Sequence, residues 1–164
     1  MQKQSFENET VLVRNLVPED LEAVVTLDAK IAGRRRDEYF QVKLQQALAE
    51  TGVKVSLAGE RDGNFAGFCL ARVFYGEFGQ AEPVAVLDTF DVAPEYQGSG
   101  VGRALIRQLR TNLLGLGIKK LQTQVAWDNQ RMLSFFQHAG FEPAARIALD
   151  LDLAAARRRE ETES

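Results

Sequence analysis

Residues 84–103 read VAVLDTFDVAPEYQGSGVGR and pass from an apolar run through a glycine-rich turn into a helical pattern. The apolar run Val84–Val92 is typical of a central strand. From Val101 onward the apolar residues recur with helical spacing. The turn therefore joins the end of a strand to the start of a helix, and this junction is where we expect the chemistry of the protein.

The glycines of the turn favour the binding of an anion. Gly98, Gly100 and Gly102 fall within five residues. Without Cβ atoms the backbone can approach a ligand closely, and the N–H groups of the first helical turn have no acceptor within the helix. Such a cradle suits a diphosphate. The competing interpretation is a tight strand-to-helix turn with no ligand.

Two well-known phosphate-binding motifs fit this stretch poorly. A Walker A loop requires lysine and then serine or threonine after its last glycine, and Arg103 follows Gly102 here. A dinucleotide-binding turn requires a third glycine where Arg103 stands, at the opening of a βαβ unit, whereas hairpin strands are expected before this one.

The motif Gln97-x-x-Gly100-x-Gly102 after the strand resembles the Q/R-x-x-G-x-G/A motif of the GNAT acyltransferases. A second block, WDNQRMLSFFQHAGF at 127–141, is similar to the family's asparagine followed by an aromatic-rich helix that ends in Gly-Phe. The similarity covers residues 11–153 in element order. It implies an α/β fold of the α+β kind, with a mixed, mostly antiparallel sheet, a splayed parallel pair of strands and about four flanking helices.

The resemblance also implies an acetyl-CoA-dependent N-acetyltransferase. The cofactor would lie where Val84–Val92 splays from the next parallel strand, expected at Lys120–Trp127. The pantetheine arm would pair with the open strand edge, and backbone amides of the turn would hold the pyrophosphate. The residues expected to bind the cofactor are Phe90, Asp91, Val92, Gln97, Gly98, Ser99, Gly100, Val101, Gly102, Arg103, Asn129 and Phe136.

Asp88 is the candidate general base, because alternation along the strand places it on one apolar face with Val86, Phe90 and Val92. Burial would raise the pKa of its carboxyl. The competing interpretation is that Asp88 is held in an ion pair. Glu77 and Glu82, in the preceding loop, are weaker candidates that could instead contact a cationic acceptor.

The general acid has no assignment. Relatives carry tyrosine at the second aromatic position of the helix signature, and this chain has Phe136 there. Water, Tyr39, Tyr75, His138 or direct loss of the thiolate remain alternatives. Cys69 lies in an apolar run and is expected in the core, so direct transfer in a ternary complex is favoured.

The composition excludes several other classes of protein. The chain has 164 residues with one Cys and one His, which excludes Cys/His metal sites and internal disulfides. A net charge of -3 gives no basic footprint for nucleic acid, and no apolar run is long enough for a membrane helix. A lone thiol and the absence of a signal-peptide pattern favour the cytoplasm.

The order of elements indicates one domain over residues 1–164, with a core at about 11–153 and frayed polar ends. Strands are expected at 11–16, 53–57, 65–74, 84–92, 120–127 and 146–153, and helices after Pro18, at 37–49, from Val101 to about 115, and from about 129 to 139. The last strand is expected because Ile147, Leu149, Leu151 and Leu153 alternate with polar residues.

The acceptor stays open at this point. The arginines at 34–36 would suit an acceptor with a carboxylate or phosphate, and the acids Glu77 and Glu82 would suit a polyamine or a lysine-bearing peptide. A small-molecule or peptide amine is therefore expected, with neither nucleic acid nor membrane as partner, and a homodimer is compatible with the sequence. The runner-up function is a catalytically silent CoA-binding module.

Overall fold

The computed structural model describes residues 11–49 and 53–163, and its contacts divide the chain into two compact units. The first runs to Asn129 and the second begins at Gln130. In the first unit the elements are β1 (Leu12–Asn15), α1 (Leu21–Ala32), α2 (Asp37–Ala47), β2 (Leu57–Arg61), β3 (Asn64–Phe74), β4 (Val84–Val92), α3 (Val101–Gly115) and β5 (Leu121–Thr123). Single 3-10 turns lie at Pro18–Asp20, Glu77–Gly79 and Pro94–Tyr96.

The strands of the first unit form one sheet in the order β1-β2-β3-β4-β5. The pairs from β1 to β4 are antiparallel, and β4 pairs with β5 in parallel. The β2–β3 turn uses Asp62 and Gly63 with φ of 53° and 76°, as its Asp-Gly step predicts. The mixed sheet with one parallel pair confirms the predicted fold class.

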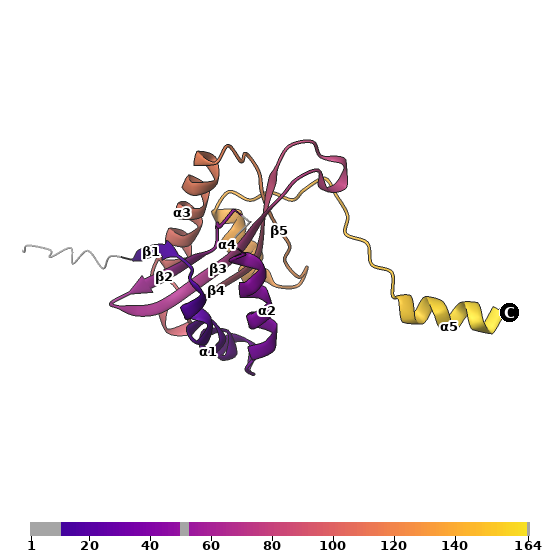
Figure 1. Ribbon diagram of the computed structural model, residues 1–164, viewed down its shortest axis with the longest axis horizontal. Coiled ribbons are helices and arrows are strands. Elements are labelled where there is room, and N and C mark those ends of the chain that lie inside the picture. The colour runs from indigo at the N-terminus through magenta and orange to yellow at the C-terminus, as the bar shows by residue number, and fades with distance from the viewer. Residues whose placement is uncertain (1–10, 50–52, 164) are drawn as a thin grey trace, which may run out of the picture. The chain divides into compact units, whose positions relative to one another are not determined.

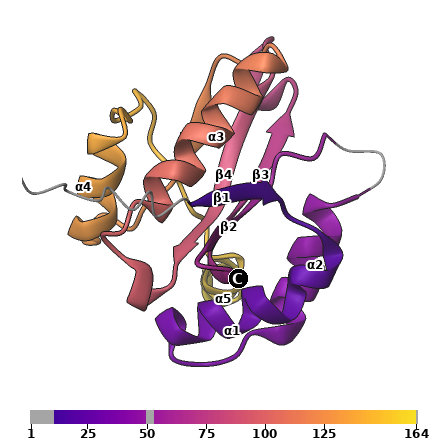
Figure 2. The ribbon, with the colours of Figure 1, turned by 90° about the vertical axis from the view of Figure 1, so that its left-hand side faces the viewer.

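Helices cover both faces of this sheet (Figure 2). On one face Ala58, Phe68 and Leu70 pack against Val24 and Val25 of α1 and against Phe40 and Leu44 of α2. On the other face the first turn of α3 approaches β2 and β3 closely, because two glycines remove the Cβ atoms that would keep it away. A Cβ at Gly59 would lie 3.3 Å from Val101 Cγ1, and one at Gly67 would lie 3.0 Å from the same atom.

Several predicted boundaries change in the structure. Two of the expected strands are displaced or shorter: β2 begins at Leu57, four residues after the expected start at Val53, and β5 is limited to Leu121–Thr123 within the expected 120–127. The later start of β2 follows from its pairing with β1, because β1 pairs only with residues 57–60. Residues 51 and 52 lie outside the described residues.

The second unit contains α4 (Gln130–His138) and α5 (Leu153–Glu163), joined by residues without regular secondary structure (Figure 1). The predicted strand at 146–153 is therefore wrong. No strand among the described residues pairs with this segment, and the side chains of Ile147 and Leu149 are 85% and 88% exposed. Alternation of apolar residues predicts a strand only where a neighbouring strand and a covered face exist.

Residues 157–163, which the sequence predicts to fray, lie within α5. Asp152 Oδ1 accepts a hydrogen bond from the backbone N–H of Ala155 at the start of α5, at 3.0 Å. Arg157 and Glu161 form an ion pair one turn apart, at 3.0 Å. A side-chain cap and an i,i+4 pair both favour a helix in a sequence rich in Ala, Arg and Glu.

The approach of α3 to Gly67 predicts a large cost for a single methyl group. In Gly67→Ala the new Cβ would lie 2.9 Å from the backbone oxygen of Asp91, which cannot move without disturbing β4. We expect the free energy of unfolding to fall by about 1–3 kcal/mol, measured by urea denaturation.

The matched control is Gly115→Ala. Its Cβ would meet nothing within 4 Å, and the residue is helical. That variant should gain up to about 1 kcal/mol, because alanine is the better helix former. Equal stability of Gly67→Ala and the wild-type protein would contradict the role assigned to this contact.

Candidate active site

The glycine turn forms a cradle of backbone N–H groups at the start of α3. Gly98 and Gly100 have φ of 75° and 91°, a conformation that residues with a Cβ rarely adopt, and Gly100 is the N-cap of the helix. The first backbone bond into α3 runs from the Ala104 N–H to the Gly100 oxygen, at 3.0 Å. The N–H groups of residues 101–103 therefore have no acceptor within the helix. A cradle of this kind fits a diphosphate.

The predicted splay between β4 and β5 is present. The two strands pair only through Ala85–Leu87 and Leu121–Thr123. Thr123 Oγ1 donates a hydrogen bond to the Leu87 oxygen at 2.8 Å, at the last paired position. Beyond Leu87, β4 continues to Val92 with no strand on its β5 side among the described residues. This open edge leads directly to the cradle, so a chain of amides with a diphosphate at one end fits the two together.

A β-bulge at Asp88 corrects the predicted face of this residue. Leu70 pairs with Thr89 and Ala71 with Leu87, so Asp88 has no partner on β3. The extra residue shifts the alternation. Phe90 and Val92 share the α3 face with their partners on β3, whereas Asp88 forms an ion pair with Lys43 of α2 on the opposite side of the sheet.

Asp91 is predicted to contact the cofactor through its backbone, and the structure shows that its side-chain carboxyl is also unusual. It lies opposite Phe68, on the α1 and α2 side of the sheet. Its Oδ2 is buried without a hydrogen-bond partner. Burial and the neighbouring carboxyl of Asp28 raise the pKa of Asp91 to about 7. Asp28 is itself bound by Arg36 at 2.8 and 2.6 Å, so one guanidinium serves two carboxyls.

A sequence signal for this pair did exist. Asp28 occupies a position on the apolar stripe of α1 together with Val24 and Val25, and a carboxyl on such a stripe must find a partner. The matching acid on β4 could not be found from spacing alone, because the bulge decides which of Asp88 and Asp91 faces α1.

The arginines at 34–36 differ in their surroundings. Arg35 pairs with Glu22 and Asp37, and Arg36 pairs with Asp28. Arg34 is exposed. Two of the three positive charges are therefore held by carboxylates of α1 and α2, which leaves them poorly suited to bind an anionic acceptor.

Cys69 is fully buried, and burial raises the pKa of its thiol to about 12. Only a thiolate attacks a thioester efficiently. The prediction that Cys69 is a core residue is confirmed.

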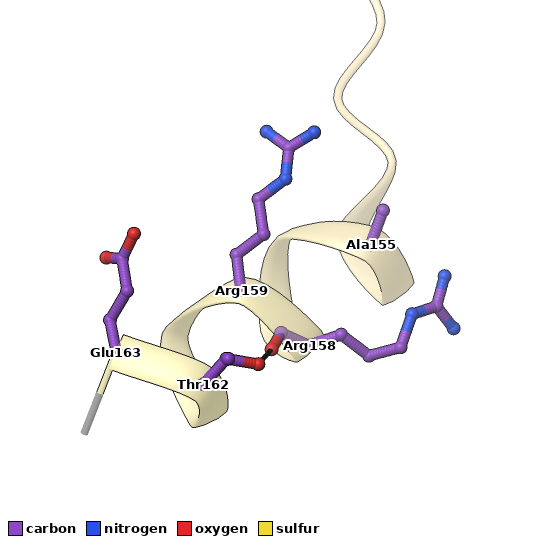
Figure 3. A pocket seen from close by; sticks show the side chains of 5 residues that line it. All are labelled: Ala155, Arg158, Arg159, Thr162 and Glu163. Carbon is purple, nitrogen blue, oxygen red and sulfur yellow. Dashed lines mark hydrogen bonds between the residues drawn. The ribbon is translucent and has the colours of Figure 1, made fainter.

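The described residues contain no group of three or more His, Cys, Asp and Glu side chains that could hold a metal ion. Among the same residues no helix is both long and apolar enough to cross a membrane. The hollow drawn in Figure 3 is lined by five residues of α5 alone, including Arg158, Arg159 and Glu163. Because a single helix supplies every lining residue, this hollow cannot enclose a ligand.

The model of the acetyltransferase (GNAT) family matches residues 21–141, about three quarters of the chain. The chain belongs to the GNAT family. As a GNAT enzyme it is an acetyl-CoA-dependent N-acetyltransferase, with acetyl-CoA as co-substrate. The cradle and the open edge of β4 fit that co-substrate. The predicted resemblance of residues 97–102 and 127–141 to the motifs of the GNAT family is confirmed.

An aminoglycoside N(6')-acetyltransferase type 1 from Stenotrophomonas maltophilia is 31% identical over 107 residues, which are 64% of this chain and 70% of that protein. Among solved structures, aminoglycoside N-acetyltransferase AAC(6')-Iy in complex with CoA superposes with a TM-score of 0.74 at 20% identity, covering 88% of this chain and 95% of that one. A ribosomal-protein-alanine N-acetyltransferase from Brucella melitensis gives 0.71 at 20% identity, covering 88% of this chain and 100% of that one. These structural likenesses show the GNAT fold.

Asn129 and Phe136, which are also predicted to bind the cofactor, belong to the first and the second unit respectively. The backbone N–H of Asn129 donates to the Ala126 oxygen at 2.9 Å, in the turn before α4. In the second unit the ring of Phe136 meets those of Phe135 and Phe141 edge to face. The alternative proton donors are exposed: Tyr39, Tyr75 and His138.

The GNAT cradle predicts different effects for two glycines that both have a positive φ, 91° at Gly100 and 77° at Gly117. Gly100→Ala and Gly117→Ala each place a Cβ at positive φ in open space, at opposite ends of α3. Each should lose about 1–2 kcal/mol of stability. Only Gly100→Ala should also weaken CoA binding, by about tenfold in Kd measured by calorimetry, because its methyl group enters the cradle. Equal binding by the two variants would contradict the cradle.

The raised pKa of Asp91 predicts a dependence of stability on pH. Between about pH 4 and pH 7 the folded protein retains a proton on Asp91 that the unfolded chain has released, so the free energy of unfolding falls as pH rises through this window. Asp91→Asn should remove this dependence and be more stable than the wild-type protein at pH 8, by about 1 kcal/mol or more.

The control for this measurement is Asp150→Asn, at an exposed position of the second unit. It should keep the wild-type pH dependence in the same denaturant titrations. An Asp91→Asn protein whose stability changes with pH as the wild-type protein's does would show that Asp91 is already ionised in the folded state.

Proposed function

We propose that the protein transfers the acetyl group of acetyl-CoA to a primary amine of a small polycationic molecule, of the amino-sugar class. The curated relative from Stenotrophomonas maltophilia, named for acetylation of an aminoglycoside 6' amine, carries this proposal. The charges support it, because Arg35 and Arg36 are already paired with acids while Glu77 and Glu82 are exposed. The fold does not decide the acceptor, since a protein named for ribosomal-protein alanine matches about as well.

The co-substrate would lie along the open edge of β4, with its pantetheine arm beside residues 90–92 and its diphosphate in the cradle of residues 97–103. Asn129 and Phe136 would contact the pantetheine arm. The family match runs from residue 21 to 141, across the division between the two units, which supports one acyltransferase domain. A reducing, cytoplasmic compartment remains our proposal, on the ground of the single buried thiol.

Direct transfer in a ternary complex is supported by the state of Cys69, whose buried, protonated thiol makes a poor nucleophile. The acceptor amine attacks the thioester carbon, a C–N bond forms, and the C–S bond breaks with its electron pair on sulfur. The acceptor ammonium loses one proton before attack, and the second proton lost from nitrogen neutralises the CoA thiolate. Backbone N–H groups of β4 near Val92 would polarise the carbonyl.

Two carboxyls of β4 are candidates to receive the first proton. Asp88, at the bulge, is paired with Lys43, so an acceptor ammonium would have to displace that lysine first. Asp91 has no cation of its own, and its raised pKa near neutrality suits proton transfer. Asp88→Asn should slow turnover without weakening CoA binding if Asp88 is the base, and Asp91→Asn should do so in the other case.

The function is tested by thiol release from acetyl-CoA with matched acceptors: an aminoglycoside with a 6' amine, its analogue with a 6' hydroxyl, and a peptide with an N-terminal alanine. We expect sustained release with the 6' amine only. CoA at 100 times its Kd should add about 2.7 kcal/mol of stability in thermal melting. Stabilisation without release from any amine would establish the silent CoA-binding module instead, and release with the peptide alone would reject the amino-sugar class.

A further inference from the structure

We propose that Arg61, at the end of β2, is a positioning residue that orients the diphosphate cradle for acetyl-CoA. The proposal rests on the assignment of the cradle made above and deepens it. Neither the glycine motif nor the family's second signature includes Arg61, because this residue lies 36 positions before Gln97 in the sequence.

Two residues of the β2–β3 hairpin contact the segment that leads into the cradle. Arg61 Nη1 donates a hydrogen bond to the backbone oxygen of Ser99 at 2.5 Å. Asn64 Nδ2 donates to the hydroxyl of Tyr96 at 3.1 Å. The Arg61 side chain is only 11% exposed, and the nearest Asp62 carboxylate oxygen is 4.0 Å from its Nε. The hairpin thus contacts the backbone of the cradle, at the Ser99 oxygen, through the buried guanidinium of Arg61.

The hydrogen bond from Arg61 to the Ser99 oxygen also sets the direction of the next N–H group, that of Gly100. In a trans peptide the C=O and the following N–H point in opposite directions. Arg61 draws the Ser99 C=O toward the hairpin. The N–H of Gly100 then points away from the hairpin, to the side where the N–H groups of the first turn of α3 are available. Without Arg61 the positive φ of Gly100 would not by itself fix this peptide, because glycine is conformationally permissive.

The hairpin is a firm support for this purpose. Its turn is a tight Asp62-Gly63 step with both φ values positive, and Arg61 pairs directly with Asn64. Val101 packs closely on Gly59 and Gly67, and this contact holds the start of α3 against the same two strands. The guanidinium of Arg61 also places a positive charge beside the proposed diphosphate site.

The inference predicts a loss that depends on which part of the co-substrate is present. Arg61 Nη1 contacts the Ser99 oxygen in the segment that leads into the diphosphate cradle, whereas the pantetheine arm is proposed to lie along residues 90–92. Acetyl-CoA carries the diphosphate, whereas S-acetylpantetheine carries the same thioester and arm without it. Loss of Arg61 should therefore matter for the first substrate and not for the second.

The test measures kcat and KM of Arg61→Ala, Arg61→Lys and the wild-type protein with both thioesters. With acetyl-CoA we expect KM to rise about tenfold or more in Arg61→Ala, the effect of losing a hydrogen bond to a charged group, with kcat little changed. Arg61→Lys keeps the charge and should recover part of the loss. With S-acetylpantetheine both variants should match the wild-type protein within about twofold. The control is Arg72→Ala, which removes an exposed arginine of β3 and should alter neither substrate's KM.

Each outcome decides the inference. Equal losses with both thioesters would show that Arg61 only maintains the fold, and unchanged KM for acetyl-CoA would show that it does not orient the cradle. If Arg61→Ala melts below the assay temperature, Arg61→Lys and Arg61→Gln carry the same comparison. A wild-type protein that is not stabilised by acetyl-CoA would overturn the proposed co-substrate site and this inference together, whereas normal wild-type behaviour with unaffected variants would overturn the inference alone.

Discussion

The close contact between α3 and the β2–β3 hairpin is the constraint on which the site depends. Val101 can sit over this part of the sheet only because Gly59 and Gly67 have no Cβ there. This packing of Val101 places the amino end of α3 beside the end of β4, so the cradle and the open strand edge are adjacent. A larger residue at either glycine would move the helix, and the backbone N–H groups that the site uses would move with it.

A second constraint is the extra residue in β4. The bulge at Asp88 lets the strand present Phe90 and Val92 to the α3 face while two carboxyls, Asp88 and Asp91, reach the α1 and α2 side. One strand therefore separates the two halves of a transfer reaction. In the proposed function its edge and carboxyl end would hold the thioester, and its other face would carry the carboxyls that can meet a charged amine.

The sequence predicted the family, the mixed sheet and the cradle because each has a local signal. Spaced glycines after an apolar strand and a helical period from Val101 do not depend on distant partners. The failures share one cause, which is dependence on a partner elsewhere in the chain. The register between β3 and β4 sets the face of Asp88, and the alternation at 146–153 has no neighbouring strand to pair with. Arg61 was missed because only the folded hairpin brings it to Ser99.

The burial of Cys69 has a consequence for the chemistry of the product. Each turnover of a GNAT enzyme releases free CoA, a thiol that forms mixed disulfides with accessible cysteines under mild oxidation. This chain has one cysteine, and that residue is fully buried with its thiol protonated. The one thiol of the chain is therefore shielded, in the folded protein, from forming a mixed disulfide with the CoA that each turnover releases.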